Sequence, residues 1–222
     1  AKYPGTEVIT YDAVSFSGTI KANELSFGKP ALATYNFDKA EVIVGFDADF
    51  LGNWVNSTEH ARQYGVTRKL FGKTSMSRHY QFESTLTITG SNADHRYKLK
   101  PSQQGAAVVS LYNKLAALAG TASAGSATTG VEDGITKAAR DLWNSRGKSL
   151  VVAGSNDSNV QLVVNAINNI LGNYNNTLSI DTHSNLRQGA DEKVAALIAE
   201  MQSGSVDVLL INNSNPAYTY PD

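Results

Sequence analysis

The chain has 222 residues, 41% of them hydrophobic and 18% charged, which is typical of a globular protein and excludes a disordered or fibrous one. Its 19 basic and 20 acidic residues give a net charge of −1, so the basic surface of a nucleic-acid-binding domain is not expected. The absence of cysteine excludes thiol nucleophiles and cysteine-bound zinc or iron–sulfur clusters on this chain.

Membrane insertion and secretion leave no sign in the sequence. No apolar run approaches the roughly 20 residues that span a bilayer. Residues 1–12 carry neither the basic nor the apolar region of a secretion signal. We therefore expect no direct membrane insertion, and either a cytoplasmic protein or a piece of a longer one.

Helices and short apolar strands are predicted to alternate in the first half of the chain. Strands are expected at residues 6–12 and 40–47, and a weaker one at 80–83. Helices are expected at 57–65 and at 105–120, where apolar side chains recur at helical spacing.

The second half alternates more regularly. The three expected helices lie at 131–147, 158–171 and 194–204, and the three expected strands at 149–154, 177–181 and 207–212. Thr129 and Glu132 are spaced as a capping box for the first of these helices. Such alternation predicts an α/β fold of the Rossmann-like, three-layer αβα kind, with mainly parallel strands covered on both faces.

A run of small residues at 120–130 divides the predicted elements into two lobes. Its sequence, "GTASAGSATTG", cannot fill a core and indicates a loop. We expect a first α/β lobe at 1–119 and a second at 131–222, with the loop between them.

Polar loops follow nearly every expected strand. They begin at Asp47, Glu83, Gly154, Asp181 and Asn212. Because the carboxyl ends of parallel strands meet at one edge of a sheet, these loops are expected to share a rim. Helix N-termini at such a rim suit phosphates, so the set favours a polar, phosphorylated ligand. The plainer interpretation is that helix caps require Ser, Asp and Asn in these loops.

Motifs for autonomous catalysis are absent. The chain has no dinucleotide fingerprint, P-loop, zinc-protease motif or nucleophile elbow. Its four histidines are scattered and none forms a metal-binding pair with another; they are His60, His79, His95 and His183. Tyr218 and Tyr220 follow the last expected strand and could stack on a planar ligand, or belong to an irregular end of the domain.

Two acidic groups remain as candidates. Asp47 and Asp49 follow one strand and could hold magnesium or act in acid–base chemistry, but capping and solvation are the commoner roles. Asp94, His95 and Arg96 are consecutive, so their side chains cannot easily converge. We favour an Asp94–Arg96 salt bridge that fixes the crossover.

Three segments resemble the molybdopterin oxidoreductase family. They are "EVIVGFDADFLGNW" (41–54), "SRHYQFESTLTITGSNADHRYKLKPSQQGAAVVSLYNKL" (77–115) and "MQSGSVDVLLINNSNPAYTYPD" (201–222). The likeness is spread over almost the whole chain. It is strongest to the molybdopterin-oxidoreductase-like subunit of quinol-oxidising (alternative complex III) and polysulfide-reductase-like complexes.

The resemblance implies that this chain is the α/β middle region of such a subunit. In the family, that region binds the nucleotide ends of a molybdopterin guanine dinucleotide cofactor. The implied cofactor-binding residues here are Asp49, Glu83, Ser84, Thr85, Gly154, Ser155, Asn156, Asn213, Asn215 and Pro216. Glu83 to Thr85 are expected to face the crevice, while Asp94 to Arg96 tie the crossover back to the lobe.

The departures from the family pattern concern the phosphate contacts. Glu83-Ser84-Thr85 replaces Asp-Pro-Arg and so lacks a phosphate-pairing guanidinium. Asn212 and Asn213 stand where glycine would permit close backbone approach. Some subunits of the quinol-oxidising complexes resemble the family yet are thought to hold no molybdenum.

The leading hypothesis is therefore a redox-subunit region that binds the cofactor's nucleotide or scaffolds an electron-transfer complex without it. No cofactor is expected on this region alone, and no autonomous catalysis. The implied partners are the iron–sulfur and cofactor-capping regions of the same subunit and other subunits, at the periplasmic face of a membrane complex. The alternatives are a two-lobed module for a small polar solute, hinged at 120–130, and a metal-dependent phosphohydrolase using Asp47 and Asp49.

Overall fold

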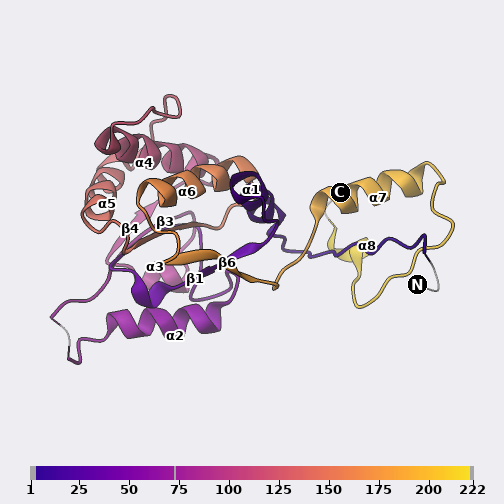
Figure 1. The fold of residues 1–222 in the computed structure, drawn as a ribbon, viewed down its shortest axis with the longest axis horizontal. Helices are drawn as coiled ribbons and strands as arrows, with labels where there is room; N and C mark the ends of the chain where they lie inside the picture. The colour runs from indigo at the N-terminus through magenta and orange to yellow at the C-terminus, as the bar shows by residue number, and fades with distance from the viewer. Residues whose placement is uncertain (1–3, 73, 221–222) are drawn as a thin grey trace.

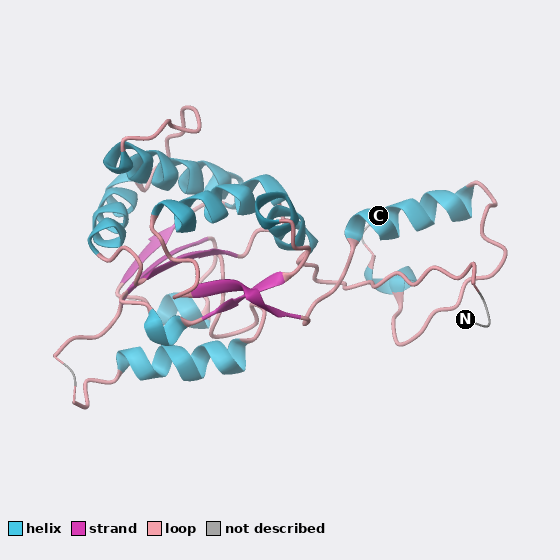
Figure 2. Cartoon of the chain, viewed as in Figure 1, coloured by secondary structure: helices cyan, strands magenta, loops and turns pink. Residues whose placement is uncertain are grey.

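The computed structural model describes residues 4–72 and 74–220 (Figure 1). The helices are α1 (Ser17–Phe27), α2 (Ser57–Arg68), α3 (Ile88–Ser91), α4 (Gln104–Ala119), α5 (Glu132–Asn144), α6 (Ser158–Ile170), α7 (Asp191–Gln202) and α8 (Pro216–Thr219). The strands are β1 (Leu32–Tyr35), β2 (Val42–Phe46), β3 (Arg78–Glu83), β4 (His95–Lys98), β5 (Ser149–Ala153) and β6 (Leu178–Ser184). Figure 2 shows the helices on either side of the central strands.

The centre of the fold is a four-stranded sheet in the order β4-β3-β2-β5. Every neighbouring pair in it is parallel, with Val44 opposite Tyr80 on one side and Val151 on the other. Helices flank this sheet, so the chain has the predicted mixed α/β, Rossmann-like character. The strand expected at 80–83 is longer than the sequence indicated and begins at Arg78.

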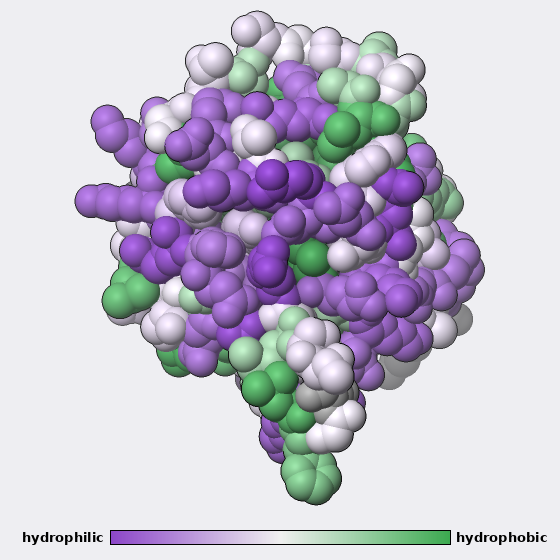
Figure 3. All heavy atoms as spheres, turned by 90° about the vertical axis from the view of Figure 1, so that its left-hand side faces the viewer, coloured by the Kyte–Doolittle hydropathy of each residue, from purple (hydrophilic) through white to green (hydrophobic). Residues whose placement is uncertain are grey.

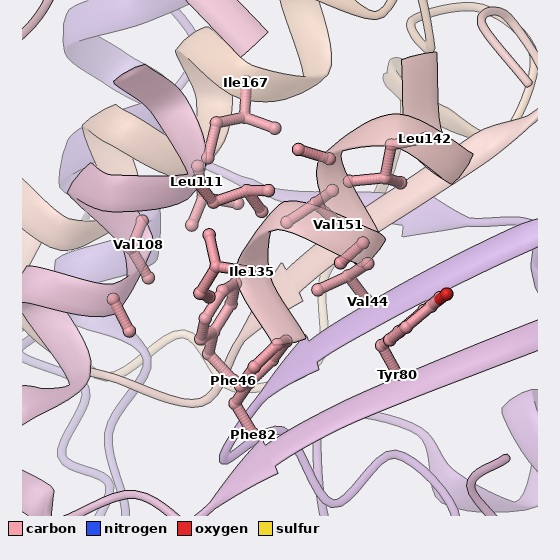
Figure 4. Packing of buried hydrophobic residues seen from close by; sticks show 14 of the residues in the cluster. Val44, Phe46, Tyr80, Phe82, Val108, Leu111, Ile135, Leu142, Val151 and Ile167 are labelled. Carbon is pink, nitrogen blue, oxygen red and sulfur yellow. The ribbon is translucent and has the colours of Figure 1, made fainter. Parts of the chain in front are cut away.

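Each face of the sheet is covered by its own apolar cluster because strand residues alternate in direction. Val44 and Phe46 point to the face covered by α4, α5 and α6, where Leu111, Ile135 and Ile167 are fully buried (Figure 4). The opposite cluster includes residues of β1, β2, β5 and β6. It also includes Phe37 before β2, and residues from Ala48 to Tyr64, which lie after β2 and in α2. The strand β2 is buried at all five positions, as a strand covered on both faces should be.

Polar side chains close the outer edge of β5. Asn168 of α6 accepts a hydrogen bond from the backbone N–H of Val151 (3.2 Å) and donates one to its carbonyl (2.8 Å). Thr177 donates to the carbonyl of Ser149 (2.6 Å), and Gln161 to that of Ala153 (2.9 Å). These side chains form hydrogen bonds with the outward-facing N–H and carbonyl groups of β5, which a fifth strand would need for pairing.

This closed edge accounts for an error in the predicted topology. The strand expected at 177–181 forms as β6, but it pairs antiparallel with β1 in a separate two-stranded sheet. Thr177, just before β6, is one of the residues that cap β5, so the chain leaves the parallel sheet at that point.

Two other expected strands do not form. Residues 6–12 and 207–212 have no strand structure. Residues 4–15 run beside the segment from 185 onward in a projection away from the sheet (Figure 1). There the N–H of Ala190 donates to the carbonyl of Thr10 (3.1 Å), and Tyr11 Oη lies 2.8 Å from Thr219 Oγ1.

The sheet crosses the expected boundary between lobes. Strand β5, from the expected second lobe, pairs with β2 of the first. The loop at 120–130 joins α4 to α5, whose apolar residues belong to the same cluster on one face of the sheet. It is therefore a connection within one helical layer, and the hinge required by the solute-binding alternative is not found there.

The expected helix starts are right in part. Glu132 accepts from the backbone N–H of Thr129 (3.0 Å), as a capping box requires, but the N-cap residue of α5 is Val131. Helix α6 is capped by Asp157, whose carboxylate accepts from the N–H of Asn159 (2.8 Å). An acidic N-cap suits the positive end of the helix dipole.

Candidate functional site

Three of the five predicted loops meet at the carboxyl edge of the parallel sheet. The N–H of Asp47, after β2, donates to Phe82 of β3 (2.8 Å), and the N–H of Gly154, after β5, donates to Phe46 of β2 (2.8 Å). Glycine is required at 154, because a Cβ there would lie 2.3 Å from the carbonyl oxygen of Asp47. The predicted rim therefore exists for the loops that begin at Asp47, Glu83 and Gly154.

The other two loops lie elsewhere, and their expected place on the rim was wrong. Asp181 is an exposed residue of the antiparallel strand β6 and forms an ion pair with Lys29. Asn212 lies between α7 and α8 in the chain, and these two helices belong to the projection (Figure 1). Since β6 pairs outside the parallel sheet and 207–212 pairs with no strand, the rule that places strand ends at one edge does not apply to them.

The C-terminal residues of the predicted site also lie in the projection, away from the rim. Asn213, Asn215 and Pro216 lie in the projection, where Asn215 is the N-cap of α8. Asn213 adopts a left-handed conformation (φ 54°), which asparagine tolerates better than most residues. Tyr218 is exposed beside them, and the Tyr220 ring lies 6.4 Å from that of Tyr11.

The Asp47 carboxylate binds the loop after β3. Its Oδ1 accepts from the backbone N–H of Ser84 (2.7 Å) and its Oδ2 from the Ser84 hydroxyl (3.0 Å). Gln104, the first residue of α4, donates to the same hydroxyl (3.2 Å). Ser84 is thus at the rim, as predicted, but its hydroxyl is engaged by two neighbouring side chains. Thr85, next to it, is exposed.

The Asp49 carboxylate has a different partner. Its Oδ1 accepts from both the N–H (3.1 Å) and the hydroxyl (2.6 Å) of Thr89 in α3. The Thr89 hydroxyl also accepts from the N–H of Leu51 (2.9 Å). Because Asp47 binds the loop after β3 and Asp49 binds α3, they do not form the paired carboxylates that the phosphohydrolase hypothesis requires.

Glu83 does not face a crevice, which corrects the sequence-based expectation. Its side chain is fully buried and accepts hydrogen bonds from Arg96 Nε (2.5 Å) and the Thr87 hydroxyl (2.7 Å). Gly90 packs against this carboxylate, and a Cβ at that position would lie 1.8 Å from Glu83 Oε1. A buried carboxylate requires such partners, and here they are Thr87, the N-cap of α3, and Arg96 of β4.

The expected Asp94–Arg96 salt bridge is also wrong. Asp94 instead pairs with both terminal nitrogens of Arg68, at the end of α2 (2.7 and 2.8 Å). Partial burial opposes ionisation of Asp94, but the hydrogen bonds from Arg68 and from the N–H of His79 outweigh it and lower its pKa. Asp94 does tie the crossover to α2 and β3, while Arg96 ties β4 to Glu83.

The loop after β5 contacts the start of α1 and of α7. Asn156 Oδ1 accepts from the N–H of Gly18 (2.8 Å), and its amide donates to Asp191 (3.0 Å). Asp191 also accepts from the Ser17 hydroxyl (2.6 Å). Ser155 accepts from the N–H of Asp157 (3.1 Å). Asn156 therefore holds the projection against the sheet, a role that its sequence position did not indicate.

The histidines occupy three kinds of environment. His60 and His79 are buried, and burial lowers the pKa of each to about 4. His95 stacks on Tyr80, with ring centroids 4.6 Å apart, and His183 is exposed on β6. In residues 4–72 and 74–220, no group of three or more acidic or histidine side chains is arranged to hold a metal ion.

Sequence reasoning missed a hollow at the opposite, amino edge of the sheet. It has a volume of about 650 Å³ and lies among the beginnings of β2, β3 and β5. Its charged lining consists of Asp38, Lys39, Glu41, Arg78, Asp141 and Lys148. Figure 3 shows this side of the molecule as mainly hydrophilic. The charged residues flanking each strand were the available signal.

Comparison with known proteins gave no match, either to a family model or to a curated protein. Within the part of the chain that the structure describes, no helix combines the length and apolarity needed to cross a membrane.

Proposed function

We propose that the chain is the α/β region of a molybdopterin-oxidoreductase-like redox subunit, and that it scaffolds an electron-transfer complex without holding the cofactor's nucleotide. The three resembling segments and the Rossmann-like sheet support the first part. The carboxyl-edge rim, where the family would bind the nucleotide, supports the second.

The observation that carries the scaffold role is that the rim's acidic side chains bind its own loops. Asp47 holds Ser84, Asp49 holds Thr89, and Glu83 holds Arg96. A pyrophosphate needs free donors and cations, whereas this edge presents carboxylates. The guanidinium of Arg96 at this edge is already paired with Glu83.

The implied residues therefore do not fit the nucleotide of a guanine dinucleotide cofactor. Asn213, Asn215 and Pro216 lie in the projection, apart from Ser84, Thr85 and Gly154 at the sheet edge (Figure 1). Of the predicted set, Glu83 is buried and Asn156 is bound to Asp191. The redox chemistry of the complex would belong to other regions or subunits.

Molybdenum and pterin analysis of the full-length subunit, purified in its complex, tests this proposal. We expect molybdenum far below one atom per subunit and no pterin fluorescence after acid oxidation. Near-stoichiometric molybdenum with pterin would refute the scaffold role and favour cofactor binding. In that case GDP should also stabilise the wild-type chain in a thermal-shift titration.

A further inference from the structure

The loop after α2 is the most exposed apolar feature of the hydrophilic side of the molecule. We call residues 69–72 and 74–76 the docking loop. Phe71 is 99% exposed, Leu70 54% and Met76 45%. The loop projects at the lower edge of Figure 3, where apolar side chains stand out from a mainly hydrophilic face. Burying exposed Phe and Leu side chains is favourable because it removes apolar surface from water, so this projection can anchor a contact.

The amino-edge hollow lies directly beside the docking loop. Ser75 and Met76 of the loop form part of its wall, and the rest comes from the segments that lead into β2, β3 and β5. A projecting apolar group beside a recessed polar surface is the arrangement of a protein interface, with an anchor and a surrounding polar rim.

The charges of the hollow are balanced. Arg78 pairs with Asp141 (2.7 Å), and Lys148 pairs with Glu41 (3.0 Å). Asp38 and Lys39, by contrast, have no ion pair within the described residues. Lys69 of the docking loop is exposed and likewise has no ion pair among them, so the surface offers one free carboxylate and two free ammonium groups. The hollow presents three carboxylates and three cations, and such mixed charge suits a protein partner that carries both signs.

A second copy of the chain is a poor occupant of this surface. In a two-fold symmetric contact, the same patch of each copy must be complementary to itself. In such a contact the docking loop would meet only Leu70, Phe71 and Met76 of the other copy, and the adjoining hollow is too polar and charged to receive Phe71. The geometry favours a partner with an apolar cleft of its own.

We propose that the docking loop and the adjoining hollow bind another protein subunit of the redox complex. This inference rests on the scaffold role proposed above. Phe71 and Leu70 enter an apolar cleft on the partner. The partner's surface around that cleft carries a cation for Asp38 and a carboxylate for Lys39.

The test uses the full-length subunit expressed with its complex and purified by an affinity tag on this chain. Phe71→Ser is compared with Leu118→Ser, a matched apolar-to-serine change at a 49% exposed position of α4. Native mass spectrometry and salt-dependent dissociation identify which stoichiometric subunit is released. Equal thermal unfolding of the two variants establishes that both are folded.

We expect Phe71→Ser to weaken the binding of one defined subunit at least tenfold, and Leu118→Ser to change it less than twofold. A photo-crosslinker at position 71 should attach to that same subunit. Charge reversal by Lys39→Glu should also weaken binding. Retention of every subunit by Phe71→Ser, or a crosslink to a subunit that is not released, would overturn the proposal.

Two further results would assign the surface to another occupant. Phe71-dependent dimerisation in analytical ultracentrifugation would favour a second copy. Phe71-dependent sedimentation with phosphatidylglycerol–phosphatidylcholine vesicles would favour a lipid surface. The molybdenum content of the same preparations is measured independently. If a complex that contains the cofactor still loses a subunit in the Phe71→Ser variant, the scaffold role is refuted and the docking proposal stands.

Discussion

Replacing Asn168 with alanine should open the outer edge of β5 and destabilise the whole sheet. The Asn168 side chain is almost completely buried and makes four hydrogen bonds. Two of them satisfy the N–H and carbonyl of Val151, which is itself fully buried. Alanine leaves both backbone groups without a partner in an apolar environment.

The magnitude follows from these lost partners. An unsatisfied buried backbone group costs about 1–3 kcal/mol, so the two groups of Val151 together cost about 2–6 kcal/mol. Alanine has a better helix propensity than asparagine, which returns about 0.5 kcal/mol. We therefore expect the free energy of unfolding to fall by about 1.5–5.5 kcal/mol, which corresponds to a decrease in Tm of roughly 3–22 °C.

The matched control is Asn169→Ala, one residue further along α6 and exposed. It changes the same residue type in the same helix, and it should alter the free energy of unfolding by no more than about 0.5 kcal/mol. Urea unfolding followed by circular dichroism measures both variants. A loss below about 1 kcal/mol for Asn168→Ala, or equal losses for the two variants, would refute the closed-edge interpretation.

Three further predictions concern the rim and the buried histidines. Arg96→Met should lower the free energy of unfolding by about 3 kcal/mol, because it leaves the buried Glu83 carboxylate without its cation, whereas exposed Arg62→Met should have little effect in the same urea assay. Gly154→Ala should cost about 1–3 kcal/mol through collision with Asp47, while Gly65→Ala, with open space around it in α2, should be neutral or stabilising; equal effects would contradict the close approach at the rim. The folded-state pKa of His60 and of His79 is about 4, below the usual 6.5, so their contribution to stability is complete above about pH 6.5 and is lost as pH falls toward 4. Each contributes about 3 kcal/mol to this change, and unfolding at pH 7 and pH 4.5 should show a smaller loss for His79→Gln than for the wild type.

Periodicity and strand-end rules were enough to predict part of the rim and three strands of the central sheet, β2, β3 and β5, whereas the short edge strand β4 (His95–Lys98) was not predicted. The apolar runs of β2 and β5 are short and bounded by polar loops, so their burial and parallel direction were readable from the sequence. Asp47, Ser84 and Gly154 were placed together because the ends of parallel strands meet at one edge. That inference needed no knowledge of individual side-chain contacts.

The errors come from pairings between residues that are distant in the chain. Nothing in the sequence indicates that the Asn168 side chain binds the outer edge of β5 in place of a neighbouring strand. The segment that forms β6 was therefore expected in the parallel sheet. Arg68 lies 26 residues before its partner Asp94, whereas the wrongly predicted partner Arg96 is only two residues away. Local spacing favours the near residue, and only the packing of α2 brings Arg68 to the crossover.

The central pairing of β2 with β5 also affects the order in which the sheet can assemble. Strands β2, β3 and β4 are contiguous in the chain, but β5 begins more than 100 residues after β2. At about 5–20 residues per second, translation of this interval takes roughly 5–20 s. Until β5 has been synthesised, one side of the apolar strand β2 has no neighbour. The nascent polypeptide is therefore most prone to mispairing and chaperone capture before Ala153 leaves the ribosome.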